Sequence, residues 1–85
     1  MSSSPVPMRC IWSLALWLRT TRMRAGLTQQ YVAEASGIYI GMYGRIERAA
    51  LMPTEATLQR ICLVLKLDYQ FLVDMVTRGE EPMHH

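Results

Sequence analysis

The chain has 85 residues, enough for one small domain with a single hydrophobic core. Its composition, 51% hydrophobic and 19% charged, argues against a disordered chain. Two cysteines are too few for a disulfide-stapled miniprotein or a four-cysteine zinc site. The formal net charge of +2 is an average, because residues 1–48 carry six arginines and two glutamates whereas residues 49–85 carry three basic and five acidic residues.

Both ends of the chain are expected to lie outside the fold. Residues 1–9 are predicted to form a flexible arm, because Pro5 and Pro7 resist helix formation. Residues 79–85 are predicted to be a frayed tail, whose terminal histidines are either native or the remnant of a tag. The longest apolar stretch, residues 10–18, is about half the roughly 20 residues that span a bilayer, so we expect no membrane segment.

The hydrophobic period is helical throughout residues 10–78, which predicts one all-α domain of five short helices without strands. Thr28, Thr54 and Asp68 are suited to cap the second, fourth and fifth helices through their side-chain oxygens. The predicted helices span about residues 10–24, 29–35 and 39–48, with a fourth after Pro53-Thr54 and a fifth after Asp68.

Two short helices joined by a turn around Gly37 are the general signature of a helix-turn-helix. Ala33 is small enough for two helices to cross closely, and Gly37 permits the turn. The spacing of four apolar residues predicts that they bury the inner faces of the second and third helices: Val32, Ile38, Tyr43 and Ile46.

A longer series of motifs supports this assignment and extends from Leu14 to Leu72. The pieces are Leu18-Arg19-x-x-Arg22-x-x-x-Gly26-Leu27-Thr28-Gln29, Val32-Ala33, Gly37-Ile38, Ile46-Glu47-Arg48, Pro53, and Thr57-Leu58-x-x-Ile61 running on to Leu65-x-Leu67. In their order and spacing they resemble the lambda-repressor and Cro-like helix-turn-helix family (the XRE class). The resemblance implies a five-helix DNA-binding domain with the helix-turn-helix at the second and third helices.

The resemblance also implies which residues meet DNA. The third helix would enter the major groove, with Gln29 at the phosphate backbone and with Gln30 and Arg48 as further phosphate contacts. Arg45 is the best candidate for reading a base, because its guanidinium matches guanine O6 and N7 with two hydrogen bonds worth about 1–3 kcal/mol. By position, the groove-facing residues are Tyr39, Ile40, Gly41, Gly44 and Arg45.

Arg22 and Glu47 correspond to a pair that forms a buried ion pair in the family. We therefore assign Arg22 to structure and not to phosphate binding. Losing one partner of such a pair costs about 3–5 kcal/mol, because the other charge is left uncompensated.

The predicted function is a small sequence-specific transcriptional regulator that binds palindromic double-stranded DNA as a homodimer. The dimer surface is expected on the fifth helix, with Trp12 and Trp17 as a possible extension and with Phe71 assigned to the monomer core. The residues expected at the dimer surface are Tyr69, Leu72, Val73, Met75 and Val76.

The alternative is a protein-interaction module, antitoxin-like or an adaptor, with weak or no DNA binding on the same fold. It rests on an apolar cluster where groove-facing residues are usually polar. The cluster that would contact the partner is Tyr39, Ile40, Met42, Leu51 and Met52.

No enzyme activity, cofactor or metal site is expected. The two histidines lie in the tail, and no nucleophile–base pair, carboxylate pair or phosphate-loop motif is present in the sequence. Reduced cysteines and the lack of an export signal predict the cytoplasm of a bacterium or of a phage-infected cell.

Overall fold

The computed structural model describes residues 5–82, and this part of the chain is all-α, as the sequence predicted. Five α-helices follow one short 3₁₀ helix, and no strand occurs among the described residues. The elements are η1 (Met8–Cys10), α1 (Ile11–Arg24), α2 (Gln29–Ser36), α3 (Ile40–Glu47), α4 (Glu55–Leu65) and α5 (Tyr69–Thr77).

Side-chain caps determine where three of these helices begin. The side-chain oxygens of Thr28, Thr54 and Asp68 accept hydrogen bonds from backbone amides three residues later, at 3.0, 3.3 and 2.8 Å. Each bond satisfies an amide that has no partner within its own helix. Lys66 ends α4 in the left-handed conformation at φ 56°, a position that glycine often occupies.

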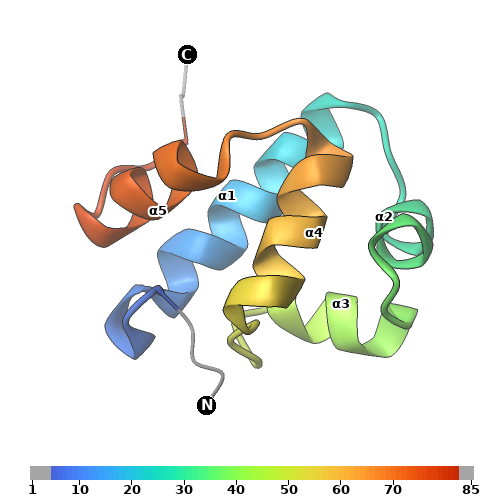
Figure 1. Ribbon diagram of the computed structural model, residues 1–85, viewed down its shortest axis with the longest axis horizontal. Coiled ribbons are helices and arrows are strands. Elements are labelled where there is room, and N and C mark those ends of the chain that lie inside the picture. Colours follow the sequence, from blue (N-terminus) through green and yellow to red (C-terminus); the bar gives the residue numbers. More distant parts are fainter. Residues whose placement is uncertain (1–4, 83–85) are drawn as a thin grey trace.

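The helices enclose one core (Figure 1). In this view α5 lies on one side and the α2–α3 pair on the other, with α1 and α4 between them. Helix α2 packs against α3 and α4, while α1 packs against α3 and α5. The core therefore connects the helix-turn-helix to the C-terminal helix. Its most deeply buried residues include Leu14, Leu18, Val32, Ala33, Tyr43, Ile46, Leu58, Ile61, Leu72 and Val76.

The flexible arm predicted for residues 1–9 is wrong for its second half. Val6 is only 3% exposed and belongs to the core, and the amide of Cys10 donates to the carbonyl of Pro7 at 2.8 Å to close η1. Pro7 stands at the N-cap of η1 with an extended backbone. The proline thus lies just before a helix, where its lack of an amide hydrogen does no harm.

The frayed tail predicted for residues 79–85 is likewise wrong for residues 79–82. The indole Nε1 of Trp17 donates to the carbonyl of Glu80 at 2.8 Å, and Pro82 is buried. Gly79 permits this return with a φ of 75°. The terminal histidines lie outside the described residues.

The outer face of α5 differs from the one predicted. Leu72, Val73 and Val76 are buried in the monomer core, so they offer almost no area to a dimer surface, whereas Tyr69 and Met75 are partly exposed. Phe71, which the sequence assigned to the core, is 46% exposed and meets the ring of Trp17 edge-on at 5.8 Å. The reason is periodicity: the helix has more apolar residues than its buried face can hold.

Candidate nucleic-acid interface

The turn between α2 and α3 orients the second helix of the motif. Gly37 takes a left-handed conformation at φ 79°, and the amide of Ile38 donates back to the carbonyl of Ala33 at 3.0 Å. Tyr39 then has an extended backbone and stands at the N-cap of α3. These three residues set the angle at which α3 leaves α2.

An ion pair holds α3 against α1. Arg22 Nε lies 2.6 Å from Glu47 Oε2, and Arg22 Nη2 donates to Oε1 of the same carboxylate at 3.0 Å. The remaining Arg22 nitrogen, Nη1, donates to the carbonyl of Leu27 at 2.8 Å. Arg22 therefore has the structural role that the sequence indicated.

The side-chain amide of Gln29 links α2 to the same carboxylate. Gln29 Nε2, at the first residue of α2, donates to Glu47 Oε1 at 3.0 Å. The carboxylate at the end of α3 thus accepts hydrogen bonds from α1 and from α2 together. Sequence reasoning assigned Gln29 to phosphate binding and missed this contact, which its position in the motif does not disclose.

The electrostatics of the Glu47 carboxylate follow from these contacts. Burial by itself raises its pKa, but the hydrogen bonds from Arg22 and Gln29 outweigh burial, and the pKa lies below the usual range. Tyr43 packs beside the pair with a buried hydroxyl, and burial, followed by the Glu47 charge, raises the pKa of Tyr43. Glu47 is therefore ionised and Tyr43 neutral at neutral pH.

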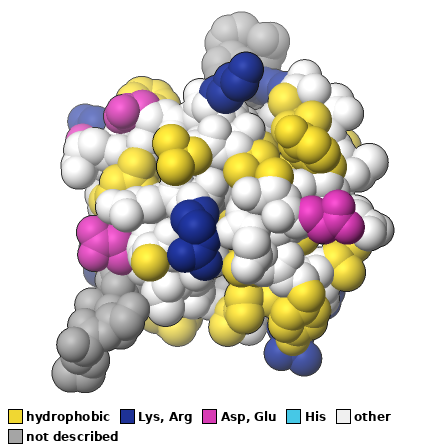
Figure 2. Space-filling view, turned by 45° about the vertical axis from the view of Figure 1, so that its right-hand side comes forward, with side chains coloured by type: hydrophobic (Ala, Val, Ile, Leu, Met, Phe, Trp, Pro, Cys, Tyr) yellow, Lys and Arg dark blue, Asp and Glu magenta, His cyan; other side chains and the backbone are white. Residues whose placement is uncertain are grey.

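Most of the predicted DNA-contacting residues lie on the surface of the helix-turn-helix. Arg45, Arg48, Gln30 and Gly41 are exposed, and Tyr39 and Ile40 are 66% and 47% exposed. Gln30 Nε2 donates to Glu34 Oε2 at 2.9 Å, within α2. On the face that Figure 2 shows, basic side chains stand apart from one another among hydrophobic groups.

Gly44 is the exception, and its assignment to the groove-facing surface is corrected. The residue is buried, and a Cβ at this position would lie 3.1 Å from Arg48 Nη1. The Arg48 guanidinium therefore folds back over Gly44 towards the start of α2, where the Gln29 side chain lies. Glycine at this position gives room to an arginine and presents nothing to a base.

The apolar cluster behind the alternative reading is mostly part of the fold. Met42, Leu51 and Met52 are partly buried and pack against the core. Only Tyr39 and Ile40 of that cluster are exposed. The surface left for a protein partner at this place is consequently small.

One further contact and one backbone conformation lie at the ends of the motif. Arg60 Nε of α4 donates to the carbonyl of Ser36 at 2.9 Å, at the C-terminal end of α2. Ala49, after α3, takes the left-handed conformation at φ 62°, where a glycine is common. The Arg60 contact could not be predicted from the sequence, because an arginine on a helix surface is ordinarily solvated.

Cys10 and Cys62 are both free and buried. Burial, reinforced by the charge of Asp68, raises the pKa of Cys62 to about 12, so this thiol stays protonated at neutral pH. Within residues 5–82, no group of three or more histidine, cysteine, aspartate or glutamate side chains could hold a metal ion. No helix in the same range is long and apolar enough to cross a membrane.

Comparison with known proteins agrees with this geometry. A family described as a helix-turn-helix domain matches residues 13–70, and the chain belongs to that family of helix-turn-helix proteins, not to a class of enzymes. The fold is also similar to two crystal structures of the clp gene regulator ClgR from Corynebacterium glutamicum. No curated protein sequence matches the chain significantly.

The two ClgR structures resemble the chain over most of its length. One is 23% identical with a TM-score of 0.75, and the match covers 82% of this chain and 74% of that one. The other is 22% identical with a TM-score of 0.74, covering 87% and 96%. At these identities the similarity establishes the fold.

The Glu47 carboxylate gives a test of how the motif is held together. We expect Glu47→Gln to destabilise the protein by about 3–5 kcal/mol at neutral pH, because Arg22 is left without its counter-charge. A lowered folded-state pKa means that the pair stabilises fully above the unfolded-state value of about 4.3 and less as pH falls through the folded-state value. Urea unfolding across that range should show the gap between the two proteins narrowing at low pH.

The matched control is Glu34→Gln, because Glu34 is an exposed carboxylate on α2. It should change the unfolding free energy by less than about 0.5 kcal/mol at every pH. Equal effects of the two substitutions would show that the Arg22–Glu47 pair does not hold the helices.

Proposed function

We propose that this protein is a sequence-specific DNA-binding transcriptional regulator that places α3 in the major groove and acts as a homodimer. The observation that supports this most is the exposure of Arg45 on an α3 whose orientation is fixed by the Glu47 carboxylate. An arginine on a helix that is held in one orientation can form two hydrogen bonds with guanine. The proposal also places the protein in the cytoplasm, of a bacterium or of a phage-infected cell, where its DNA would lie.

The surroundings of Arg45 support phosphate contacts on either side of the groove. Arg48 and Gln29 lie close together at the start of α2, where the positive end of a helix favours an anion. Between α1 and α3 lies a shallow hollow of about 430 Å³ whose lining includes Trp12, Arg19 and Arg48. Arg19 is thus a further candidate for contact with the DNA phosphate backbone, and Trp12 is an apolar residue that lines the same hollow.

The interaction module is the weaker alternative, with Tyr39 and Ile40 as its remaining support. An exposed aromatic and an exposed isoleucine are also compatible with a groove, since thymine carries a methyl group there. The observation that favours DNA over a protein partner is that Ile40 begins the helix that carries Arg45, and Tyr39 stands at the N-cap of that helix.

Arg45→Ala should lower the affinity for the preferred duplex about five- to a hundredfold, the loss of one bidentate contact with guanine. The preferred duplex is obtained by selection from a random library, and affinity is measured by fluorescence anisotropy across a salt series. Arg48→Ala should weaken binding to all duplexes alike and reduce the salt slope by about one phosphate contact.

Arg78→Ala is the matched control, since Arg78 is exposed at the end of α5, away from α3. It should leave the preference unchanged. Weak and equal binding of every duplex by the wild-type protein and by Arg45→Ala would contradict the proposal and favour the interaction module.

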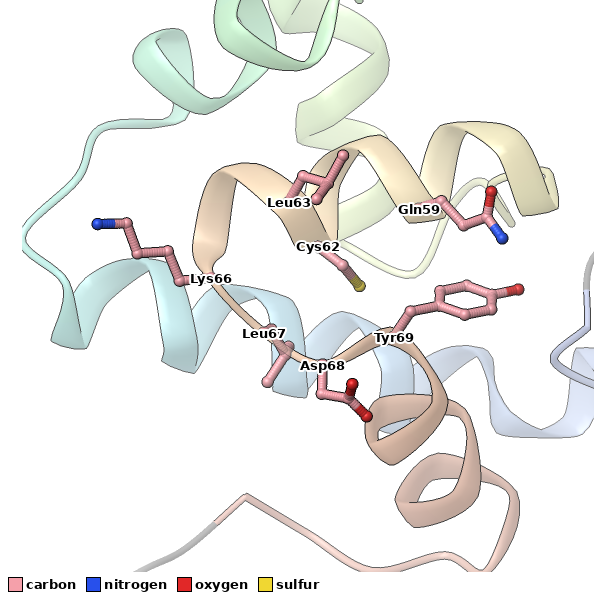
Figure 3. A pocket seen from close by; sticks show the side chains of 7 residues that line it. All are labelled: Gln59, Cys62, Leu63, Lys66, Leu67, Asp68 and Tyr69. Atoms are coloured by element: carbon pink, nitrogen blue, oxygen red, sulfur yellow. The ribbon is translucent and has the colours of Figure 1, made fainter.

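For the homodimer, the groove at the junction of α4 and α5, which has both apolar and polar lining residues, is the proposed surface. Leu63 is 79% exposed and stands at a groove of about 560 Å³ between the end of α4 and the start of α5 (Figure 3). Cys62, Leu67 and Tyr69 line the same groove. The Tyr69 side chain is partly buried there, and its hydroxyl is buried.

Two copies would read a longer DNA site than one copy can. One helix-turn-helix reads only a few base pairs, and a two-fold pair reads a palindrome across two half-sites. Of the five residues first expected at the dimer surface, Tyr69 lines this groove and Met75 is partly exposed, while the other three close the core. The proposed surface therefore moves from the buried face of α5 to its junction with α4.

Leu63→Glu tests the dimer by placing a charge on this face. We expect sedimentation equilibrium to show a dimer for the wild-type protein and a monomer for the variant, with circular dichroism unchanged because Leu63 is not part of the core. Met23→Glu is the control, since Met23 is an exposed apolar residue on α1, and it should stay dimeric. A wild-type monomer at high concentration, with or without DNA, would refute the dimer.

A further inference from the structure

The beginning of α3 carries a side chain whose position the fold alone does not explain. Tyr39 stands at the N-cap, yet it makes no capping hydrogen bond with its side chain and is 66% exposed. A serine, threonine, asparagine or aspartate at this position would satisfy an amide of the first turn. The tyrosine therefore gives the helix neither a cap nor buried area.

Gly41 accounts for where the ring lies. A Cβ on Gly41 would be 2.7 Å from Tyr39 Cε2 and 3.2 Å from Cδ2, so one edge of the ring lies against the place where a side chain would be. Gly41 does not have a positive φ, and glycine inside a helix lowers its stability. Neither the backbone nor helix formation requires this glycine, whereas the observed position of the Tyr39 ring leaves no room for a Cβ there.

The ring and Arg45 lie on the same face of α3. Residues four apart in a helix share a face, so Gly41 places the ring about one turn, roughly 6 Å, before Arg45. Successive base pairs in DNA are about 3.4 Å apart, so two groups at this separation reach base pairs within about two steps of each other. Ile40, the next residue in the chain after Tyr39, is apolar and 47% exposed.

We propose that Tyr39, held against Gly41, reads the methyl group of a thymine within about two base pairs of the guanine read by Arg45. The C5 methyl of thymine is the apolar group that the major groove displays, and an aromatic ring is a surface on which it loses contact with water. Tyr39 is the specificity-determining residue, and Gly41 is the positioning residue that leaves room for the ring. The inference rests on the proposed function, because it assumes that α3 lies in the major groove.

The experiment starts from the duplex that the wild-type protein enriches most from a random 20-base-pair library. Thymines of that duplex are replaced one at a time by deoxyuridine, which removes only the methyl group. At one thymine near the essential guanine, the wild-type protein should lose about fourfold in affinity, the value of burying one methyl group. Tyr39→Ala and Gly41→Ala should bind the thymine and uracil duplexes equally.

Gly41→Ala separates recognition from stability. Alanine favours the helix, so thermal unfolding should show a fold at least as stable while the preference for thymine disappears. The double variant Tyr39→Ala/Gly41→Ala should lose no more of that preference than either single variant, because both act through one ring. Gln70→Ala, at an exposed position of α5, should keep the full preference.

The outcomes separate this inference from the function on which it rests. A wild-type protein that enriches no duplex overturns both. A guanine preference that depends on Arg45, together with a thymine-to-uracil effect that is absent or equal in wild type and the Tyr39 variant, overturns the role of Tyr39 alone. A methyl effect that vanishes in both single variants while the guanine preference remains supports it.

Discussion

The helix-turn-helix of this protein depends on one buried carboxylate. Glu47 ends α3, and its two oxygens accept hydrogen bonds from Arg22 on α1 and from Gln29 on α2. Packing alone permits two helices to slide or rotate against each other, whereas a bidentate ion pair is satisfied at one orientation. The orientation of α3, and with it the exposed face of the helix on which Arg45 stands, follows from this contact. The same contact takes Arg22, and part of the hydrogen-bonding capacity of Gln29, away from the surface.

Few side chains remain on the surface of the helix-turn-helix to contact a ligand, and two glycines of α3 leave room for two of them. Gly44 leaves room for the Arg48 guanidinium beside α2, and Gly41 leaves room for the Tyr39 ring at the start of the helix. Each glycine lowers helix stability and places a neighbouring side chain. In the proposed function, the surface that reads DNA consists of an aromatic ring, an isoleucine and an arginine, with a few cations around it. Such a surface would gain selectivity from the placement of these side chains more than from charge, because few phosphates would be neutralised.

The sequence predicted the helices and the motif because these depend on local patterns. The periodicity of apolar residues, the caps Thr28, Thr54 and Asp68, and Gly37 in the turn all operate within a few residues. Contacts between distant segments left no such pattern. The Trp17 bond to the Glu80 carbonyl, which orders the tail, and the Arg60 bond to the Ser36 carbonyl each link an unremarkable residue to a backbone atom. Burial on α5 was misjudged because six apolar side chains compete for one inner face, and only packing decides that Phe71 stays outside and Val73 inside.

The most direct test of the account is a titration of the ¹⁵N-labelled protein with its selected duplex, followed by amide chemical shifts. The account predicts that the largest changes fall at the start of α2 and along residues 39–48, with the Arg45 side-chain signal shifting as well. Changes at the α4–α5 groove would be small in a protein that is already dimeric. Shifts confined to the α4–α5 groove, or spread evenly over all exposed amides, would show that α3 is not the surface that reads DNA.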